Sequence, residues 1–283
     1  MKSNIEISQM PTKFGISQGR LTPSDQLQRF PSEAWQLEFS NAKKLGLAFI
    51  ELLTERHFNK DNPVWSSIGR QEIRDACATS GCEIYSICID YIIDHSMLDD
   101  GSKTTLKHVE DVFVAAADLG CEIVIFPLLE KSNLDLNSAD QFVEIFLALS
   151  KKARKYNLTI CVESLMKASD LVSFLERVDE DNVRAVFDTG NRVIQHDGND
   201  LYGEILRLNK FIKHIHIKDK TSDGENVILG TGLVDFRSVF LALRKIDYEG
   251  PLNFETTRGR DPLATAAFHI ALCEFFKYEV SLI

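Results

Sequence analysis

The chain has 283 residues, of which 44% are hydrophobic and 26% are charged. These values are typical of a globular protein with a sizeable core. Its 42 acidic residues outnumber its 32 lysines and arginines, which gives a formal net charge of −10. That sign argues against a duplex nucleic-acid binder, because such proteins need a basic surface. No segment approaches the roughly 18 consecutive apolar residues of a membrane helix, so we expect no membrane partner.

The six cysteines do not form a metal-binding or disulfide pattern. They are Cys77, Cys82, Cys88, Cys121, Cys161 and Cys273. No two of them have the Cys-x-x-Cys spacing, and most lie in apolar segments where cysteine behaves as a small hydrophobic residue. The first residues are polar and lack the apolar run of a secretory signal. We therefore expect a reduced, cytoplasmic protein.

One pattern recurs along the chain: a short apolar segment, a loop, and then an amphipathic helical segment. Strands are predicted at Lys13–Ser17, Ala48–Leu53, Glu83–Asp90, Glu122–Phe126, Leu158–Glu163, Arg184–Asp188, Ile212–Ile217 and Leu252–Glu255. Helices are predicted at Ala34–Leu45, Ile68–Thr79, Thr104–Leu119, Ala139–Tyr156, Ala168–Arg177, Leu201–Asn209, Phe236–Lys245 and Pro262–Phe276. The pattern predicts alternating strands and helices over nearly the whole chain.

Residues at the helix ends support these boundaries. Ser138 and Asp235 precede two of the helices, and both residue types are favoured N-caps. Gly46, Gly81 and Gly120 follow helix ends, where glycine readily adopts a left-handed conformation. These residues therefore support the predicted helix boundaries.

Strict alternation of strands and helices predicts a parallel sheet. The strand–helix units average about 35 residues, the usual length of such a unit. No linker divides the chain, so we predict one domain over residues 1–283 with the α/β fold class of a (β/α)8 TIM barrel. The competing open sheet would favour a Gly-x-Gly-x-x-Gly turn after the first strand, but the sequence there reads ISQGRLTPS.

Four of the later strands end in residues that suit a metal site. Alternation along each strand places Glu163, Asp188, His216 and Glu255 on the inward face at the carboxyl end. Active sites of such barrels lie at this end. Three carboxylates and an imidazole suit one divalent ion, and we leave Mn²⁺, Mg²⁺, Co²⁺ and Zn²⁺ open.

The sequence resembles the xylose-isomerase-like TIM barrels, especially the sugar and sugar-phosphate isomerases and 3-epimerases. The segments that carry the resemblance read, in order, VESL, FDTGN, HIHIKDK, GTGLVDF and PLNFE. The resemblance implies that Glu163, Asp188, His216 and Glu255 bind the ion. It also implies that His214, the first histidine of its motif, is a structural neighbour of the site.

The resemblance implies a metal-dependent isomerase or epimerase that acts on a sugar or sugar phosphate. An ion that chelates a carbonyl and the adjacent hydroxyl would stabilise an enediolate. Glu163 and Glu255 would then act as base and acid on opposite faces. Return of the proton to the same carbon gives epimerisation, whereas return to its neighbour gives aldose–ketose isomerisation, and the motifs do not separate the two.

Five further residues are candidates for substrate binding: Glu51, His95, Asn191, Lys218 and Arg258. Glu51 is expected to end the second strand, where the family often has an acid that reaches the substrate or an inner ligand. Lys218 follows His216 on the inward face, although an ion pair with a neighbouring acid is an equal alternative. Asn191 stands where many relatives have histidine, a form compatible with sugar-phosphate epimerases.

Two residues after the first strand, Gln18 and Arg20, are candidates to close the mouth of the barrel. Lys220 and Arg260 join Arg258 as candidate positive charges for a phosphate.

Two rival functions remain open at this stage. One is a dehydratase of the same superfamily, like the inosose and dehydroshikimate dehydratases, and the other is a non-catalytic sugar-binding barrel. By analogy with the family, we expect a homodimer or homotetramer.

Overall fold

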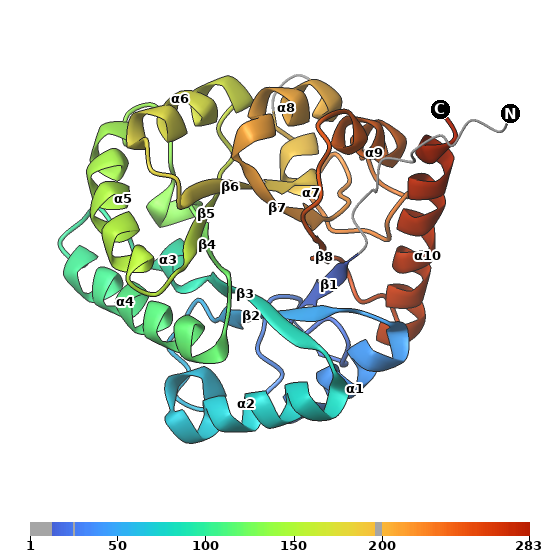
Figure 1. Ribbon diagram of the computed structural model, residues 1–283, viewed down its shortest axis with the longest axis horizontal. Coiled ribbons are helices and arrows are strands. Elements are labelled where there is room, and N and C mark those ends of the chain that lie inside the picture. The colour runs from blue at the N-terminus through green and yellow to red at the C-terminus, as the bar shows by residue number, and fades with distance from the viewer. Residues whose placement is uncertain (1–12, 25, 196–199) are drawn as a thin grey trace, which may run out of the picture.

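The computed structural model describes residues 13–24, 26–195 and 200–283. Eight parallel strands close into a barrel in sequence order, because β1 pairs with both β2 and β8 (Figure 1). The strands are β1 Phe14–Ser17, β2 Phe49–Thr54, β3 Glu83–Ile89, β4 Ile123–Pro127, β5 Thr159–Glu163, β6 Val183–Asp188, β7 Ile212–Ile217 and β8 Leu252–Phe254. The predicted (β/α)8 fold is confirmed.

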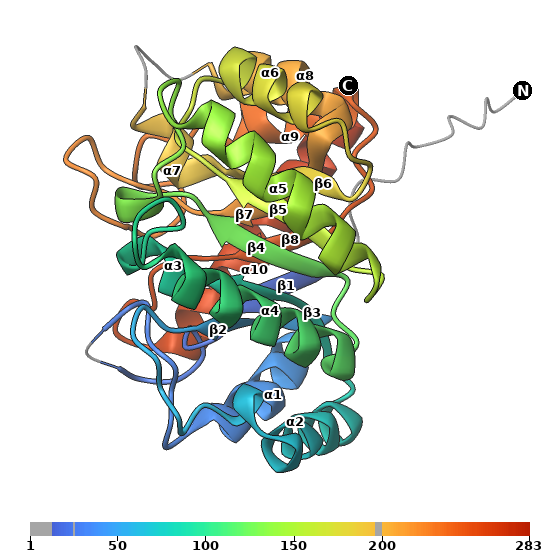
Figure 2. The ribbon, with the colours of Figure 1, turned by 90° about the vertical axis from the view of Figure 1, so that its left-hand side faces the viewer.

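Long helices surround the barrel and cover its outer face (Figures 1 and 2). They are α1 Trp35–Leu45, α2 Ser67–Ser80, α4 Ser102–Leu119, α5 Ala139–Arg154, α6 Ala168–Val178, α8 Leu201–Leu208, α9 Phe236–Lys245 and α10 Pro262–Ser281. Shorter helices are α3 Tyr91–Asp94, α7 Thr189–Val193, η1 Pro63–Trp65, η2 Glu130–Ser132 and η3 Asn209–Phe211. The short helices α3 and α7 directly follow β3 and β6 and lie on the same side of the barrel (Figure 2).

Most of the predicted helix ends agree with the structure. Gly46, Gly81 and Gly120 have φ values of 71°, 74° and 75°, and the Asp235 side chain accepts the Ser238 N–H at 3.1 Å. Ser138 also lies at the predicted N-cap position of α5, but its side chain makes no capping hydrogen bond. Its hydroxyl is instead bonded within the preceding loop.

Side chains alternate between two buried layers, as expected for strands covered by helices outside and packed inside. Outward residues such as Ile160, Phe187 and Ile215 belong to the large core between barrel and helices. Inward residues form a small separate apolar cluster that includes Cys88 and Cys161. Nearer the carboxyl ends of the strands, the inward residues are polar, and the candidate site lies there.

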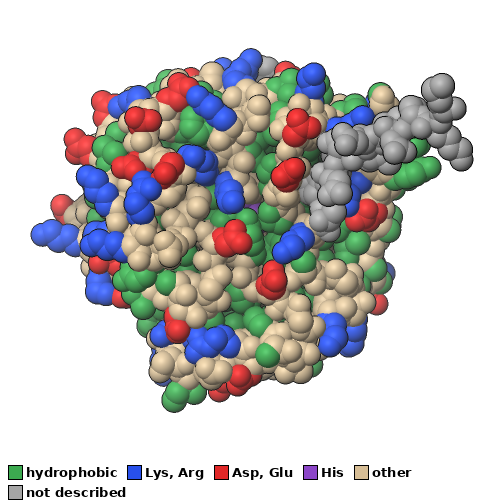
Figure 3. Space-filling view, in the orientation of Figure 1, with side chains coloured by type: hydrophobic (Ala, Val, Ile, Leu, Met, Phe, Trp, Pro, Cys, Tyr) green, Lys and Arg blue, Asp and Glu red, His purple; other side chains and the backbone are tan. Residues whose placement is uncertain are grey.

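The surface agrees with the expectations from composition. On the face seen in Figure 3, Lys and Arg side chains are interspersed with Asp and Glu. All six cysteines are unpaired. Within the described ranges, no helix combines the length and apolar character needed to cross a membrane.

Candidate metal centre and active site

Four side chains from adjacent strands converge at the carboxyl end of the barrel. Glu163 ends β5, Asp188 ends β6, His216 lies near the end of β7, and Glu255 directly follows β8. One potential ligand atom from each lies within 4.8 Å of all the others. The first three are at most 5% exposed, so the cluster is largely shielded from water.

The two nitrogens of His216 face different groups. Nδ1 lies 2.9 Å from Glu255 Oε2, 3.6 Å from Glu163 Oε2 and 3.8 Å from Asp188 Oδ2. This nitrogen and Asp188 Oδ2 are both buried, yet neither has a hydrogen bond of acceptable geometry among the described residues. Carboxylate oxygens that converge on one imidazole nitrogen in this way fit a divalent cation.

Glu51 lies behind His216, inside the barrel. Its Oε1 is 3.1 Å from His216 Nε2, and its Oε2 is 3.0 Å from His214 Nε2. A carboxylate behind a metal-binding histidine fixes the orientation and the tautomer of the ring. Glu51 therefore has the geometry of a residue that orients His216.

This position differs from the one expected for Glu51. The strand β2 continues to Thr54, so Glu51 lies within the strand and not at its end. The side chain is 2% exposed and accepts hydrogen bonds from Ser17, Ser86 and Asn253. It is already surrounded by protein donors and points into the barrel, away from the position expected for a substrate contact.

Glu51, His214 and His216 form a second group with metal-ligand spacing. This group is the poorer candidate, because both oxygens of Glu51 already accept hydrogen bonds from serine or asparagine. The group also offers one carboxylate, whereas the first cluster offers three. The resemblance made His214 a structural neighbour of the site, and its contact with Glu51 agrees with that expectation.

Burial and neighbouring charges separate the pKa values of the two glutamates. Burial, reinforced by the charge of Asp188, raises the pKa of Glu163 to about 7. Burial also disfavours the charged form of Glu255, but Lys218 and His216 outweigh it and hold the pKa of Glu255 below its usual range. Without a cation, Glu163 is therefore the carboxyl that takes up a proton near neutral pH.

Lys218 is part of the cluster. Its Nζ lies 2.9 Å from both Asp188 Oδ2 and Glu255 Oε2. Although burial opposes its charge, these two carboxylates raise the pKa of Lys218, so it stays protonated. Asp219, the acid next to it in sequence, is not its partner. Asp219 accepts N–H groups of Lys220 and of residues 230–234 and organises that loop.

Asn191 contacts the cluster directly. Its backbone N–H donates to Asp188 Oδ1 at 2.7 Å, where Asp188 caps α7, and its Nδ2 donates to Glu163 Oε1 at 2.6 Å. Asn191 therefore holds one oxygen of each carboxylate.

Two other predicted contacts lie elsewhere. Arg258 is 7% exposed and donates to the backbone carbonyls of Gly19, Ser24 and Gln26, so it fastens the loop after β1. His95 follows α3 and stacks on Tyr91, with ring centroids 3.7 Å apart. Neither residue belongs to the four-residue cluster.

Asp90 is a polar residue of the mouth that we did not single out from the sequence. It follows β3, is 2% exposed, and lies behind Cys88, whose Sγ is 3.3 Å from Asp90 Oδ1. Burial raises the pKa of Asp90 to about 6. Alternation through Ser86 and Cys88 predicts that the side chain of Asp90 points inward, so this residue could have been predicted from the sequence.

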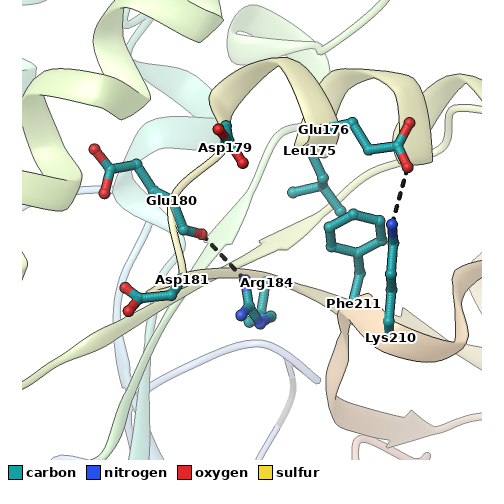
Figure 4. Close-up of a pocket in the computed structure, with 8 residues that line it drawn as sticks. All are labelled: Leu175, Glu176, Asp179, Glu180, Asp181, Arg184, Lys210 and Phe211. Atoms are coloured by element: carbon teal, nitrogen blue, oxygen red, sulfur yellow. Dashed lines mark hydrogen bonds and ion pairs between the residues drawn. The ribbon is translucent and has the colours of Figure 1, made fainter.

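The hollow in Figure 4 is a contrasting surface feature. It lies between the end of α6 and the start of β6, and the side chains of Glu176 and Lys210 form an ion pair at 3.0 Å on its wall. Arg184 donates to the backbone carbonyl of Glu180. This hollow adjoins the amino end of β6 and includes none of the clustered residues, so the chemistry lies at the opposite end of the strands.

Two curated proteins share part of the sequence. An L-ribulose 3-epimerase from Methylomonas sp. is 34% identical over 85 residues, which is 30% of this chain and 28% of that protein. A ketose 3-epimerase from Arthrobacter globiformis is 32% identical over 85 residues, or 30% of this chain and 27% of that protein. The similarity thus spans less than a third of either relative.

Solved structures share the fold at lower identity. A D-allulose 3-epimerase from Methylomonas sp. has a TM-score of 0.73 at 16% identity, over 95% of this chain and 99% of that one. A xylose isomerase-like TIM barrel protein from Mycobacterium smegmatis, solved in complex with magnesium, has a TM-score of 0.71 at 19% identity, over 97% and 98%. These similarities concern the fold alone.

A family match covers most of the barrel. The family described as xylose isomerase-like TIM barrel matches residues 39–273, which include all four clustered residues. The chain belongs to the xylose isomerase-like TIM barrel family.

Proposed function

We propose that this protein is a divalent-metal-dependent sugar isomerase of the ketose 3-epimerase type. The observation that carries the proposal is the pair of glutamates in one buried cluster, Glu163 from β5 and Glu255 after β8. Two strands separate them, and each of those strands supplies one more candidate ligand. The partial similarity to two 3-epimerases supports the same reaction class.

Glu163, Asp188, Glu255 and Nδ1 of His216 would hold the cation. When bound, a divalent cation acts as a Lewis acid that makes the C–H between a carbonyl and a hydroxyl easier to deprotonate. Glu163 accepts the proton from one face of the substrate, and Glu255 returns a proton to the other face. Lys218 compensates the negative charge of Asp188 and Glu255 throughout, because it stays protonated.

The position of Arg258 bears on the substrate class. Its guanidinium donates to three backbone carbonyls, so one of the three charges that the sequence suggested for a phosphate is engaged in holding a loop. Lys220 and Arg260 keep that prediction, so the panel for the test includes ketoses with and without a phosphate, and Mn²⁺ is a suitable cation for it.

The test is proton exchange with solvent. Protein loaded with Mn²⁺ is incubated in D₂O with a panel of ketoses, and deuterium in the recovered sugar is measured by mass spectrometry. We expect wild-type protein to introduce deuterium into at least one ketose and EDTA to abolish it. Glu255→Gln should slow this exchange by about 100-fold or more, the usual range for loss of a general acid or base.

Glu249→Gln is the matched control, because Glu249 is exposed and precedes β8. It should leave exchange unchanged. Exchange that persists in EDTA, or that Glu255→Gln does not slow, would overturn the proposed function.

A further inference from the structure

Two buried, oppositely charged residues near the metal centre each retain an atom without a partner. Arg20, in the loop after β1, and Asp90, after β3, are both 2% exposed. Arg20 Nε and Asp90 Oδ2 have no hydrogen-bond partner among the described residues. An unmatched buried donor or acceptor is costly, so such atoms mark a place where a ligand group fits.

Gln28 links the two residues. Its Oε1 accepts a hydrogen bond from Arg20 Nη2, and its side chain lies beside the Asp90 carboxyl group. Gln28 is itself only partly buried, so the pair lies directly behind a residue that borders solvent. Arg20 also donates to Leu27 O, and Cys88 Sγ donates to Asp90, which helps to fix both side chains in place.

The pair adjoins the proposed reaction centre. Arg20 Nη2 lies 3.7 Å from Glu255 Oε1, and neither Arg20 nor Asp90 belongs to the group with metal-ligand spacing. A ketose held at Glu163 and Glu255 by its carbonyl and adjacent hydroxyl would extend further along the barrel mouth. Arg20, next to Glu255, is therefore within reach of another part of the same sugar.

The unmatched atoms are a donor on Arg20 and an acceptor on Asp90. A hydroxyl group suits both kinds of atom, since it accepts a hydrogen bond from a guanidinium N–H and donates one to a carboxylate. A phosphate has no comparable fit, because the Asp90 carboxylate would repel it. We propose that Arg20 and Asp90 form a subsite for a sugar hydroxyl beyond the carbonyl–hydroxyl pair, so that the enzyme selects ketoses that carry it; this rests on the proposed function.

The test compares sugars that have and lack single hydroxyls. Binding of D-allulose, D-tagatose and the 4-, 5- and 6-deoxy analogues of each to Mn²⁺-loaded protein is measured by titration calorimetry. Asp90→Asn should weaken binding of one parent sugar by about 10- to 100-fold, the range for loss of a hydrogen bond to a charged group. One deoxy analogue of that sugar should bind wild type and variant equally.

Arg20→Lys provides a second variant that keeps the charge and removes Nε. Like Asp90→Asn, it should weaken binding of the parent sugar and leave binding of the same deoxy analogue unchanged. Asp94→Asn is the matched control, because Asp94 lies on α3 close to Asp90 in sequence but pairs with Arg56. It should leave every affinity unchanged. Thermal melting of each variant checks that it is folded.

The outcomes separate the subsite from the reaction. The subsite would be overturned if the variants lost equal affinity for the parent sugar and for all its deoxy analogues, or lost no affinity at all. This holds even if exchange in D₂O occurs. Selective binding without any exchange would support the subsite and overturn the proposed reaction. A wild-type protein that binds none of these sugars would overturn the subsite as well.

Discussion

Replacement of Glu51 by glutamine tests whether the carboxylate behind His216 serves the metal centre. Glu51 Oε1 faces Ser17 Oγ, Asn253 Nδ2 and His216 Nε2 at 3.0–3.1 Å. Its Oε2 faces Ser86 Oγ at 2.7 Å and His214 Nε2 at 3.0 Å. In either orientation the new amide NH₂ would meet at least two groups that donate to Glu51 in the native protein.

The expected cost follows from these contacts. Each buried group left unmatched costs about 1–3 kcal/mol, so Glu51→Gln should lower the free energy of unfolding by about 2–4 kcal/mol. Melting temperature should fall by roughly 3–7 °C for a chain of this size. Because His216 loses its orienting partner, Mn²⁺ affinity should fall by about 10- to 100-fold.

Glu38→Gln separates the two effects. Glu38 is also buried and accepts from the backbone of Gly19 and Leu21 and from Thr22, but it does not contact the four-residue cluster. The Glu38→Gln protein should be less stable than wild type and should keep its Mn²⁺ affinity. Calorimetric titration and thermal denaturation measure both quantities. Unchanged Mn²⁺ affinity in folded Glu51→Gln would show that Glu51 does not orient His216 for the metal.

Three further predictions concern the cluster and its loop. Burial raises the pKa of Glu163 to about 7, and although burial opposes the charge of His216, the carboxylates around it raise its pKa as well. Protons therefore compete with the cation for both ligands, and Mn²⁺ affinity should fall by at least about tenfold from pH 8 to pH 6; equal affinity at both would contradict this. Lys218→Met removes the ammonium group that pairs with Asp188 and Glu255. It should tighten Mn²⁺ binding by about tenfold and destabilise the metal-free protein. Weaker Mn²⁺ binding would show that Lys218 does not compete with the metal for these carboxylates. Asp219→Asn disrupts an acceptor of four backbone N–H groups and should cost about 2–4 kcal/mol, with faster proteolysis within residues 220–234, whereas an unchanged melting temperature would count against this role.

The sequence predicts the barrel and the convergence of the cluster well, because both depend on local periodicity. Alternation along β5 to β8 decides which residues point inward, and parallel strands bring their carboxyl ends together. Glu163, Asp188, His216 and Glu255 therefore follow from counting within single strands. The same counting along β3 predicts an inward Asp90.

The surroundings of the cluster depend on contacts that the sequence does not reveal. Glu51 meets His214 and Asn253, which are 163 and 202 residues away, and the register between β2 and β3 shifts at Ile50 and Glu51. Arg258 fastens a loop more than 230 residues earlier, a pairing that no local pattern indicates. These contacts arise only after the barrel closes.

The most direct measurement is an anomalous difference map from a crystal of this protein soaked in Mn²⁺. We expect one strong peak bounded by Glu163, Asp188, Nδ1 of His216 and Glu255. No peak at that position, or a peak at Glu51 and His214 instead, would contradict it.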